Sequence, residues 1–231
     1  FFFNSKVMSS IIQSLLSYAS CCDSSLTVKG TIIKDKTPKS KLPFVVYLPP
    51  QYNPQTKYPI LYHLHGAGVG MAWLTKDVKW TAYNNENNTD TPMIIVGPQD
   101  ITKFSMWSDG LQIQVRTQIM EELIPHVESL YSIDRERRFI QGFSMGGFGA
   151  LAIGFQHQDS FSKVIILDGA LHNWETLSKS RAFIAKSQFG DSEERFDPSS
   201  PWTITTAKAA SSTIGDTPIL MFVGSMGATT D

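Results

Sequence analysis

The sequence predicts an α/β protein with a mostly parallel central sheet and flanking helices. Seven short apolar stretches are typical of strands, and helical patterns separate the later ones. The stretch 163–167 is apolar, like strands that are buried on both faces of a parallel sheet. Hydrophobic residues make up 42% of the 231 residues and charged residues 18%. This composition indicates a compact globule and excludes a disordered, collagen-like or coiled-coil chain.

The elements follow one another without a repeat or a linker, which predicts one domain over 26–231 behind an N-terminal segment, 1–25. The expected strands are 26–33, 42–48, 58–65, 92–96, 138–141, 163–167 and 218–223. The first two should pair antiparallel. Apolar residues at every fourth position predict a long helix from Leu111 to Tyr131, which Pro125 should kink or restart. Further helices are expected over 145–155 and from Pro201, whereas 66–90 and 172–201 are polar and predicted to be irregular.

Charge and cysteine content exclude several function classes. Twenty Lys and Arg against 21 Asp and Glu give a net charge of -1, so no basic surface is available for nucleic acid. The two cysteines, Cys21 and Cys22, are adjacent and cannot form a disulfide framework or a four-ligand zinc site. No stretch reaches the roughly 20 apolar residues of a membrane span.

The N-terminal segment leaves the cellular location open. Residues 11–19 are mildly apolar behind Lys6, which fits a secretory signal or a frayed amphipathic helix. Asn87-Asn88-Thr89 is a glycosylation sequon, but so short a motif does not decide secretion. The oligomeric state also stays open.

The strongest functional motif is Gly142-Phe143-Ser144-Met145-Gly146, which fits G-x-S-x-G. A predicted strand runs into it and a small-residue helix runs out of it, as a nucleophile elbow requires. Ser144 is therefore the candidate nucleophile, in a strained turn. Side chains in place of Gly142 and Gly146 would collide with the neighbouring strand and helix. The N-terminus of the following helix points its N–H groups towards developing negative charge.

A second motif, His65-Gly66-Ala67-Gly68, follows the third strand. Attack on an ester carbonyl creates an oxyanion that needs two preorganised N–H donors. We expect them from Met145 and Ala67, with Gly66 or Gly68 as alternatives to Ala67. A histidine at a strand end before glycine is more often a structural hydrogen-bonding group than a catalytic base, so His65 is assigned a supporting role.

These blocks together resemble the putative esterase family, which includes esterase D (S-formylglutathione hydrolase), feruloyl and acetylxylan esterases, and mycolyltransferases. The runs that carry the resemblance are YLPPQY (47–52), KYPILYHLHG (57–66), ELIPHVE (122–128) and GFSMGGFGAL (142–151). It extends over roughly 42–170 and implies an α/β-hydrolase fold, no cofactor or metal, and small-molecule or carbohydrate-linked esters attacked by Ser144. The His65–Gly68 block also resembles related predicted peptidases, so amide hydrolysis stays open.

Triads of this fold follow the chain order serine, acid, histidine, and this sequence does not supply an acid and a histidine in that order after Ser144. The acid should follow the seventh strand, where only Asp231 stands, and Asp168 after the sixth strand is the alternative. No histidine follows Asp231, and His172 would need an altered chain order. We therefore expect a fragment that lacks roughly 30–60 C-terminal residues with the base. Such a fragment should hydrolyse p-nitrophenyl acetate barely above background.

Two other functions remain open from the sequence. An acyltransferase would use the same acyl-enzyme and pass it to an alcohol instead of water. A non-catalytic binding protein of this fold is the alternative from another class, although the intact elbow argues against it. Three tryptophans, Trp107, Trp174 and Trp202, lie in predicted loops or at a helix start, and could form an aromatic platform for the substrate or pack beneath loops.

Overall fold

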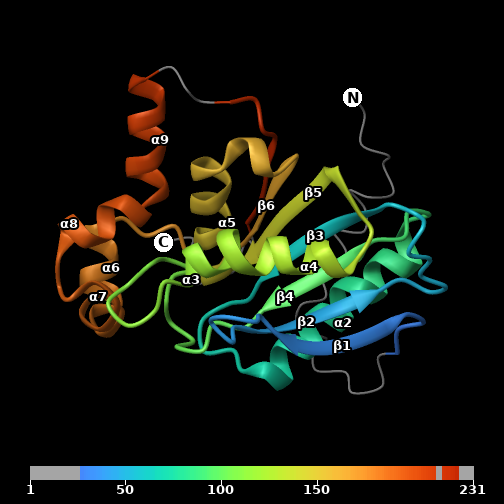
Figure 1. Ribbon diagram of the computed structural model, residues 1–231. Coiled ribbons are helices and arrows are strands. Elements are labelled where there is room, and N and C mark those ends of the chain that lie inside the picture. The colour runs from blue at the N-terminus through green and yellow to red at the C-terminus, as the bar shows by residue number, and fades with distance from the viewer. Residues whose placement is uncertain (1–26, 212–214, 224–231) are drawn as a thin grey trace.

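The sheet positions every candidate residue of the site. The computed structural model describes residues 27–211 and 215–223. Within them, seven strands form one sheet in the order β1-β2-β4-β3-β5-β6-β7 (Figure 1). The strands are β1 (Thr31–Lys36), β2 (Pro43–Leu48), β3 (Tyr58–Leu64), β4 (Ile94–Pro98), β5 (Ile133–Phe143), β6 (Lys163–Leu167) and β7 (Ile219–Phe222). β2 pairs antiparallel with β1 and β4, and the remaining neighbours are parallel, which confirms the predicted mostly parallel sheet.

Alternation along the strands divides the core into two layers. On β2, Phe44 and Val46 join the larger hydrophobic cluster, whereas Val45 and Tyr47 join the smaller one on the opposite face. Helix α2 (Met71–Asn88) covers the smaller cluster. Helices α3 (Val115–Gln118), α4 (Ile124–Leu130) and α5 (Met145–Gln156) pack over the larger one (Figure 1). Helices on both faces make the three-layer arrangement of an α/β fold.

The expectation of an irregular segment over 66–90 is wrong, because α2 occupies most of it. Its apolar stripe is narrow: Leu74, Val78 and Ala82 are buried four residues apart among polar neighbours. The amides of Asn84, Asn87 and Asn88 donate to carbonyl oxygens four residues earlier, within the helix itself. The asparagines that suggested a loop are therefore accommodated inside a helix.

The expectation of an irregular segment over 172–201 is also wrong. It folds into α6 (Trp174–Ser180), α7 (Ala182–Phe189) and α8 (Glu193–Phe196), with a short 3₁₀ turn, η4 (Asp197–Ser199), before α9 (Pro201–Ala210). The Asn173 and Ser192 side chains accept hydrogen bonds from the first turns of α6 and α8 and cap them. Phe189 and Phe196 anchor the excursion in the core. The predicted helices at 145–155 and from Pro201 are confirmed.

The long helix expected from Leu111 begins later, at Val115, and contains a π-helical turn, η2 (Ile119–Leu123), between α3 and α4. Pro125 is the second residue of α4, directly after this turn, which confirms the predicted restart. β5 starts at Ile133, five residues ahead of the predicted strand, and β1 runs on to Lys36. Residues 1–25 lie outside the described part of the chain. No helix in the described ranges is long and apolar enough to cross a membrane.

Candidate active site

The two predicted motifs meet at one edge of the sheet. β3 and β5 are parallel neighbours, so His65–Gly68 and Ser144 leave the sheet at the same carboxyl edge. A Cβ added at Gly66 would lie 3.2 Å from Cδ1 of Phe143, the residue before Ser144. A Cβ added at Gly146 would lie only 1.9 Å from the carbonyl oxygen of Leu64. The elbow and the loop after β3 are thus in direct contact.

Ser144 occupies a strained turn between β5 and α5. Its φ is 52° and its ψ is -115°, a region that L-residues rarely adopt. Its N–H donates to the carbonyl oxygen of Leu167, at 3.0 Å, and its own carbonyl accepts from Gly147 and Ala170, both at 2.9 Å. These bonds tie the residue to β6, to α5 and to the segment after β6. The side chain is left partly exposed.

Steric constraints explain why glycines surround Ser144. A Cβ at Gly142 would lie 1.9 Å from the carbonyl oxygen of Gly146, and one at Gly147 would lie 2.7 Å from Cα of Gly169. Separations under about 3 Å are not found for real Cβ atoms. The backbone of the turn therefore packs against its neighbours more closely than any side chain would allow.

Two N–H groups of these segments are not engaged. Within 27–211 and 215–223, neither Ala67 nor Met145 donates a backbone hydrogen bond. Met145 is the first residue of α5, where N–H groups have no partner inside the helix. The N–H of Gly68, at a φ of 78°, donates to the carbonyl oxygen of Lys103 at 2.8 Å. The N–H of Gly68 is therefore already used, so of these two residues Ala67 is the better candidate donor to an oxyanion.

His65 is buried and both of its ring nitrogens are used. Nδ1 lies 2.7 Å from the carbonyl oxygen of Gly66, and Nε2 lies 3.0 Å from the backbone nitrogen of Asp100. Since an N–H can only donate, Nε2 accepts and Nδ1 carries the proton of a neutral ring. Burial lowers the pKa of His65, opposed by the bond to Gly66 and the charge of Asp100. His65 stabilises the His65–Gly68 loop through these hydrogen bonds. It has no free ring nitrogen that could take a proton from Ser144.

Sequence reasoning missed a second loop, 99–107 after β4, that supports the first. The Gln99 amide donates to the carbonyl oxygen of Val69 at 2.9 Å, and the carboxylate of Asp100 accepts from the N–H groups of Thr102 and Ser105. Trp107 is fully buried, and its Nε1 donates to the carbonyl oxygen of His65 at 3.0 Å. The available signal was the polar pair Gln99-Asp100 directly after an apolar strand, at the edge where parallel strands end.

The candidate acids and bases are less closely assembled. Asp168 directly follows β6 at a φ of 45°, and its N–H donates to the carbonyl oxygen of Phe222 on β7. His172 is half-buried after β6, and burial lowers its pKa, as does the nearby charge of Arg181. No hydrogen bond joins the Ser144 hydroxyl to a histidine ring in the part of the chain that the structure describes. Asp231 lies outside the described residues.

The three tryptophans do not line a common surface. Trp107 is in the core, Trp174 begins α6 with its ring 5.7 Å from that of Phe196, and Trp202 is exposed on α9. For Trp107 the alternative of packing beneath a loop is confirmed, because its buried ring fills the space between the loop after β3 and α5. Among the described residues, no group of three or more His, Cys, Asp or Glu side chains is placed to hold a metal ion.

A family model described as "Putative esterase" matches residues 36–225. The chain belongs to this esterase family. A curated relative of this chain, named "Probable feruloyl esterase C" from Aspergillus terreus, is 25% identical over 131 residues, which are 55% of this chain and 46% of that protein. Two further curated relatives are matched over 12% and 14% of their lengths. The esterase chain thus spans less than half of each of these relatives.

Solved structures support the fold of this chain. The fluorophosphonate-binding serine hydrolase F of Staphylococcus aureus superimposes with a TM-score of 0.68 at 20% identity, over 83% of this chain and 78% of its own. The S-formylglutathione hydrolase of Agrobacterium tumefaciens gives a TM-score of 0.62 at 14% identity, over 86% and 87% of the two chains. At these identities the likeness shows the fold, and it confirms the expected α/β-hydrolase architecture.

Proposed function

We propose that this protein hydrolyses carboxylic esters through an acyl-enzyme on Ser144. The observation that carries the proposal is the strained Ser144 turn in contact with a loop that offers an unengaged N–H at Ala67, beside the unengaged N–H of Met145. Such a pairing of an exposed hydroxyl with two preorganised donors suits acyl transfer. The family and its members' names favour esters of small-molecule or carbohydrate-linked alcohols as substrates.

The chemistry follows from these positions. The hydroxyl oxygen of Ser144 bonds to the ester carbonyl carbon while its proton passes to a histidine base, and the carbonyl oxygen becomes an oxyanion held by Ala67 and Met145. The alcohol then leaves with the proton, and water attacks the acyl-enzyme in a second, equivalent step. The candidate acid is Asp231, and the alternative pair is Asp168 as the acid with His172 as the base. Each oxyanion donor is expected to contribute about 2.7–4 kcal/mol to transition-state stabilisation.

The test is covalent labelling of the full-length protein with a fluorophosphonate probe, followed by mass spectrometry of the labelled peptide, beside its turnover of p-nitrophenyl acetate. We expect label on the peptide that holds Ser144, and loss of label and turnover in Ser144→Ala. Ser178→Ala is the matched control, because Ser178 lies on α6 and donates only to Glu175 in its own helix. Undiminished turnover in Ser144→Ala would contradict the proposal.

Two further results would change the proposed function. Ester products formed from an added alcohol would assign the acyl-enzyme to acyl transfer. A folded full-length protein with neither label nor turnover would favour a binding role. His172→Ala decides the base in the same assay, because loss of turnover with retained folding would place the proton acceptor there.

A further inference from the structure

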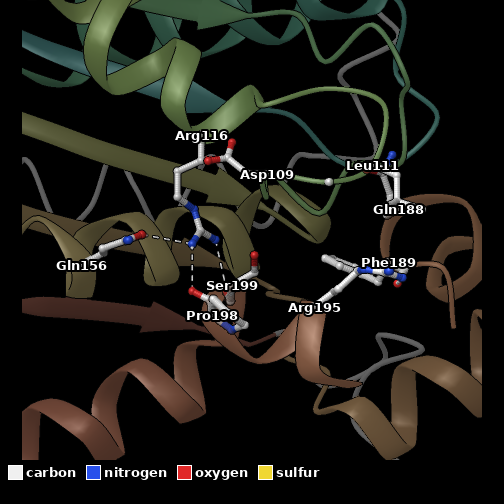
Figure 2. A pocket seen from close by; sticks show the side chains of 10 residues that line it. Asp109, Leu111, Arg116, Gln156, Gln188, Phe189, Arg195, Pro198 and Ser199 are labelled. Atoms are coloured by element: carbon white, nitrogen blue, oxygen red, sulfur yellow. Dashed lines mark hydrogen bonds between the residues drawn. The ribbon is translucent and has the colours of Figure 1, made fainter. Parts of the chain in front are cut away.

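A cavity of about 330 Å³ lies apart from Ser144, between the start of α3, the end of α5 and the segment 188–199 (Figure 2). Gln156, the last residue of α5, lines it, whereas Ser144 directly precedes the first residue of that helix. Eleven helical steps of about 1.5 Å put about 17 Å between the two ends. No residue of the elbow or of the His65–Gly68 loop is in its lining. The cavity is therefore a separate site.

The cavity contains a buried positive charge without a counter-ion. Arg116 is only 5% exposed, and its guanidinium donates to Gln156 Oε1 at 3.1 Å, to the Ser199 carbonyl at 3.1 Å and to Ser108 Oγ at 3.3 Å. All of these acceptors are neutral, and no carboxylate of the described residues lies within 4 Å of it. Burial lowers the pKa of Arg116 to about 10, so the group is still charged at neutral pH. A charge in this position is costly unless an anion complements it.

Asp109, the acidic residue in the lining, is engaged elsewhere. Its Oδ1 accepts from the N–H of Thr117 and its Oδ2 from the hydroxyl of the same residue, at 3.1 and 2.6 Å. It raises the pKa of Arg116 from a distance without pairing with the guanidinium. Arg195 adds a second positive charge at the exposed side, held only by a 3.4 Å hydrogen bond to the Phe189 carbonyl. The lining therefore carries two positive charges against one negative charge.

The rest of the lining suggests what an anion would carry with it. Ser199 is 4% exposed, its hydroxyl has no hydrogen-bond partner among the described residues, and Figure 2 shows its side chain between Arg116 and Arg195. Leu111, which is 57% exposed, forms an apolar wall on the side of Arg195. A hydroxyl and a planar guanidinium suit a carboxylate, and the apolar wall suits an organic body.

We propose that this cavity binds a small organic carboxylate. Its charged end would lie at Arg195 and Ser199, within reach of the charge of Arg116, and its apolar end would lie against Leu111. A fully polar oxyanion such as inorganic phosphate would match the charges and leave the apolar wall unused. Benzoate is the probe that carries both features, and benzamide has the same shape without the charge.

The test is isothermal titration calorimetry of the protein with benzoate, benzamide and inorganic phosphate at low ionic strength. We expect benzoate to bind at least tenfold more tightly than benzamide and than phosphate, and its affinity to fall with added salt. Equal binding of benzoate and benzamide would overturn the proposal, because the charge would then contribute nothing. Binding of phosphate without benzoate would overturn the assignment to an organic carboxylate.

Two variants test whether benzoate binds in this cavity. Arg195→Gln should weaken benzoate binding three- to tenfold, because it removes a charge-assisted hydrogen bond. Arg181→Gln is the matched control, since Arg181 is also exposed, bonds only to the Ser180 carbonyl and does not line the cavity. Arg195 is preferred to Arg116 for substitution, because Arg116 also holds Ser199 to α3. Equal effects of the Arg195→Gln and Arg181→Gln variants would show binding elsewhere and would overturn the proposal.

Discussion

The indole Nε1 of Trp107 donates a 3.0 Å hydrogen bond to the carbonyl oxygen of His65, directly before the glycine that opens the proposed oxyanion loop. The other side of the tryptophan faces α5, where a Cβ at Gly149 would lie 2.3 Å from Cβ of Trp107. One buried side chain therefore spaces the loop after β3 from the helix that begins at Met145. The distance between the two proposed oxyanion donors depends on it.

Trp107→Phe should retain most of the ring packing and lose the hydrogen bond. Leaving the buried carbonyl of His65 unsatisfied is expected to lower the free energy of unfolding by about 1–3 kcal/mol, measured by urea denaturation. Because the loop would be held less precisely, kcat should fall while KM changes little. Trp202→Phe, at an exposed position on α9, should change both quantities little. An unchanged kcat in Trp107→Phe would limit its role to packing.

Gly146→Ala should prevent normal folding. Its Cβ would meet the Leu64 carbonyl oxygen at 1.9 Å. That oxygen belongs to the backbone of β3 and the Cβ position is fixed by the backbone of the elbow, so neither can move without disrupting one of them. We expect little soluble protein, or a loss of more than about 4 kcal/mol in the free energy of unfolding. Gly70→Ala is the control, because nothing lies within 4 Å of its added Cβ and only the start of α2 is affected, at a cost of about 1 kcal/mol or less. Similar losses in both variants would show that the close approach is not the cause.

Stability should fall on acidification below neutral pH. Burial lowers the pKa of His63 from 6.5 to about 3, helped by the neighbouring His65, whose pKa is lowered as well. Between pH 6.5 and about 3 the unfolded chain binds a proton at His63 that the folded chain does not. The free energy of unfolding therefore rises with pH in this window, by up to about 1.4 kcal/mol per pH unit for each such histidine.

Urea denaturation at pH 7 and pH 4.5 measures this dependence, with His63→Gln as the comparison. His63 accepts from the Gln141 amide at 3.1 Å, which glutamine can also do. The variant should lose less stability than the parent protein over this interval. Equal losses would mean that other groups cause the acid sensitivity.

Phe183→Ala should change which esters are preferred. Phe183 is 54% exposed on α7, and its ring packs edge-on against Phe104, 5.1 Å away. Phe104 in turn lies beside Gly68, 3.9 Å from where a Cβ would be. We expect kcat/KM for p-nitrophenyl butyrate and for a cinnamate ester to fall about tenfold, with little change for p-nitrophenyl acetate. A uniform change over all three esters would show that the ring does not contact the variable group.

The strands were predictable because their signals are local. Apolar runs such as 163–167 and 58–65 end at turn residues, and every strand expected from such a run is present. Helix α2 was not predictable, because its apolar stripe of Leu74, Val78 and Ala82 is a weaker helical signal than the loop signal of its asparagines. The helices of 172–201 depend on distant packing of Phe189 and Phe196, which no local pattern reveals.

The candidate site was also predictable only where its signals are local in the sequence. The glycines of the elbow are visible in the sequence, because close backbone contact admits no other residue there. The support given by Gln99, Asp100 and Trp107 is not visible in the sequence, since it consists of contacts between residues 30 or more positions apart. Spacing along the chain carries no information about such contacts.

Ser144 keeps its unfavourable backbone conformation because segments outside the motif hold it: Leu167 accepts from its N–H, and Ala170 donates to its carbonyl. A conformation of this kind costs about 1–3 kcal/mol and relaxes when its surroundings are removed. Transplanting Gly142 to Gly146 into another scaffold would therefore not reproduce the exposed hydroxyl. A designer would have to transplant the end of β6 and the residues up to Ala170 with it.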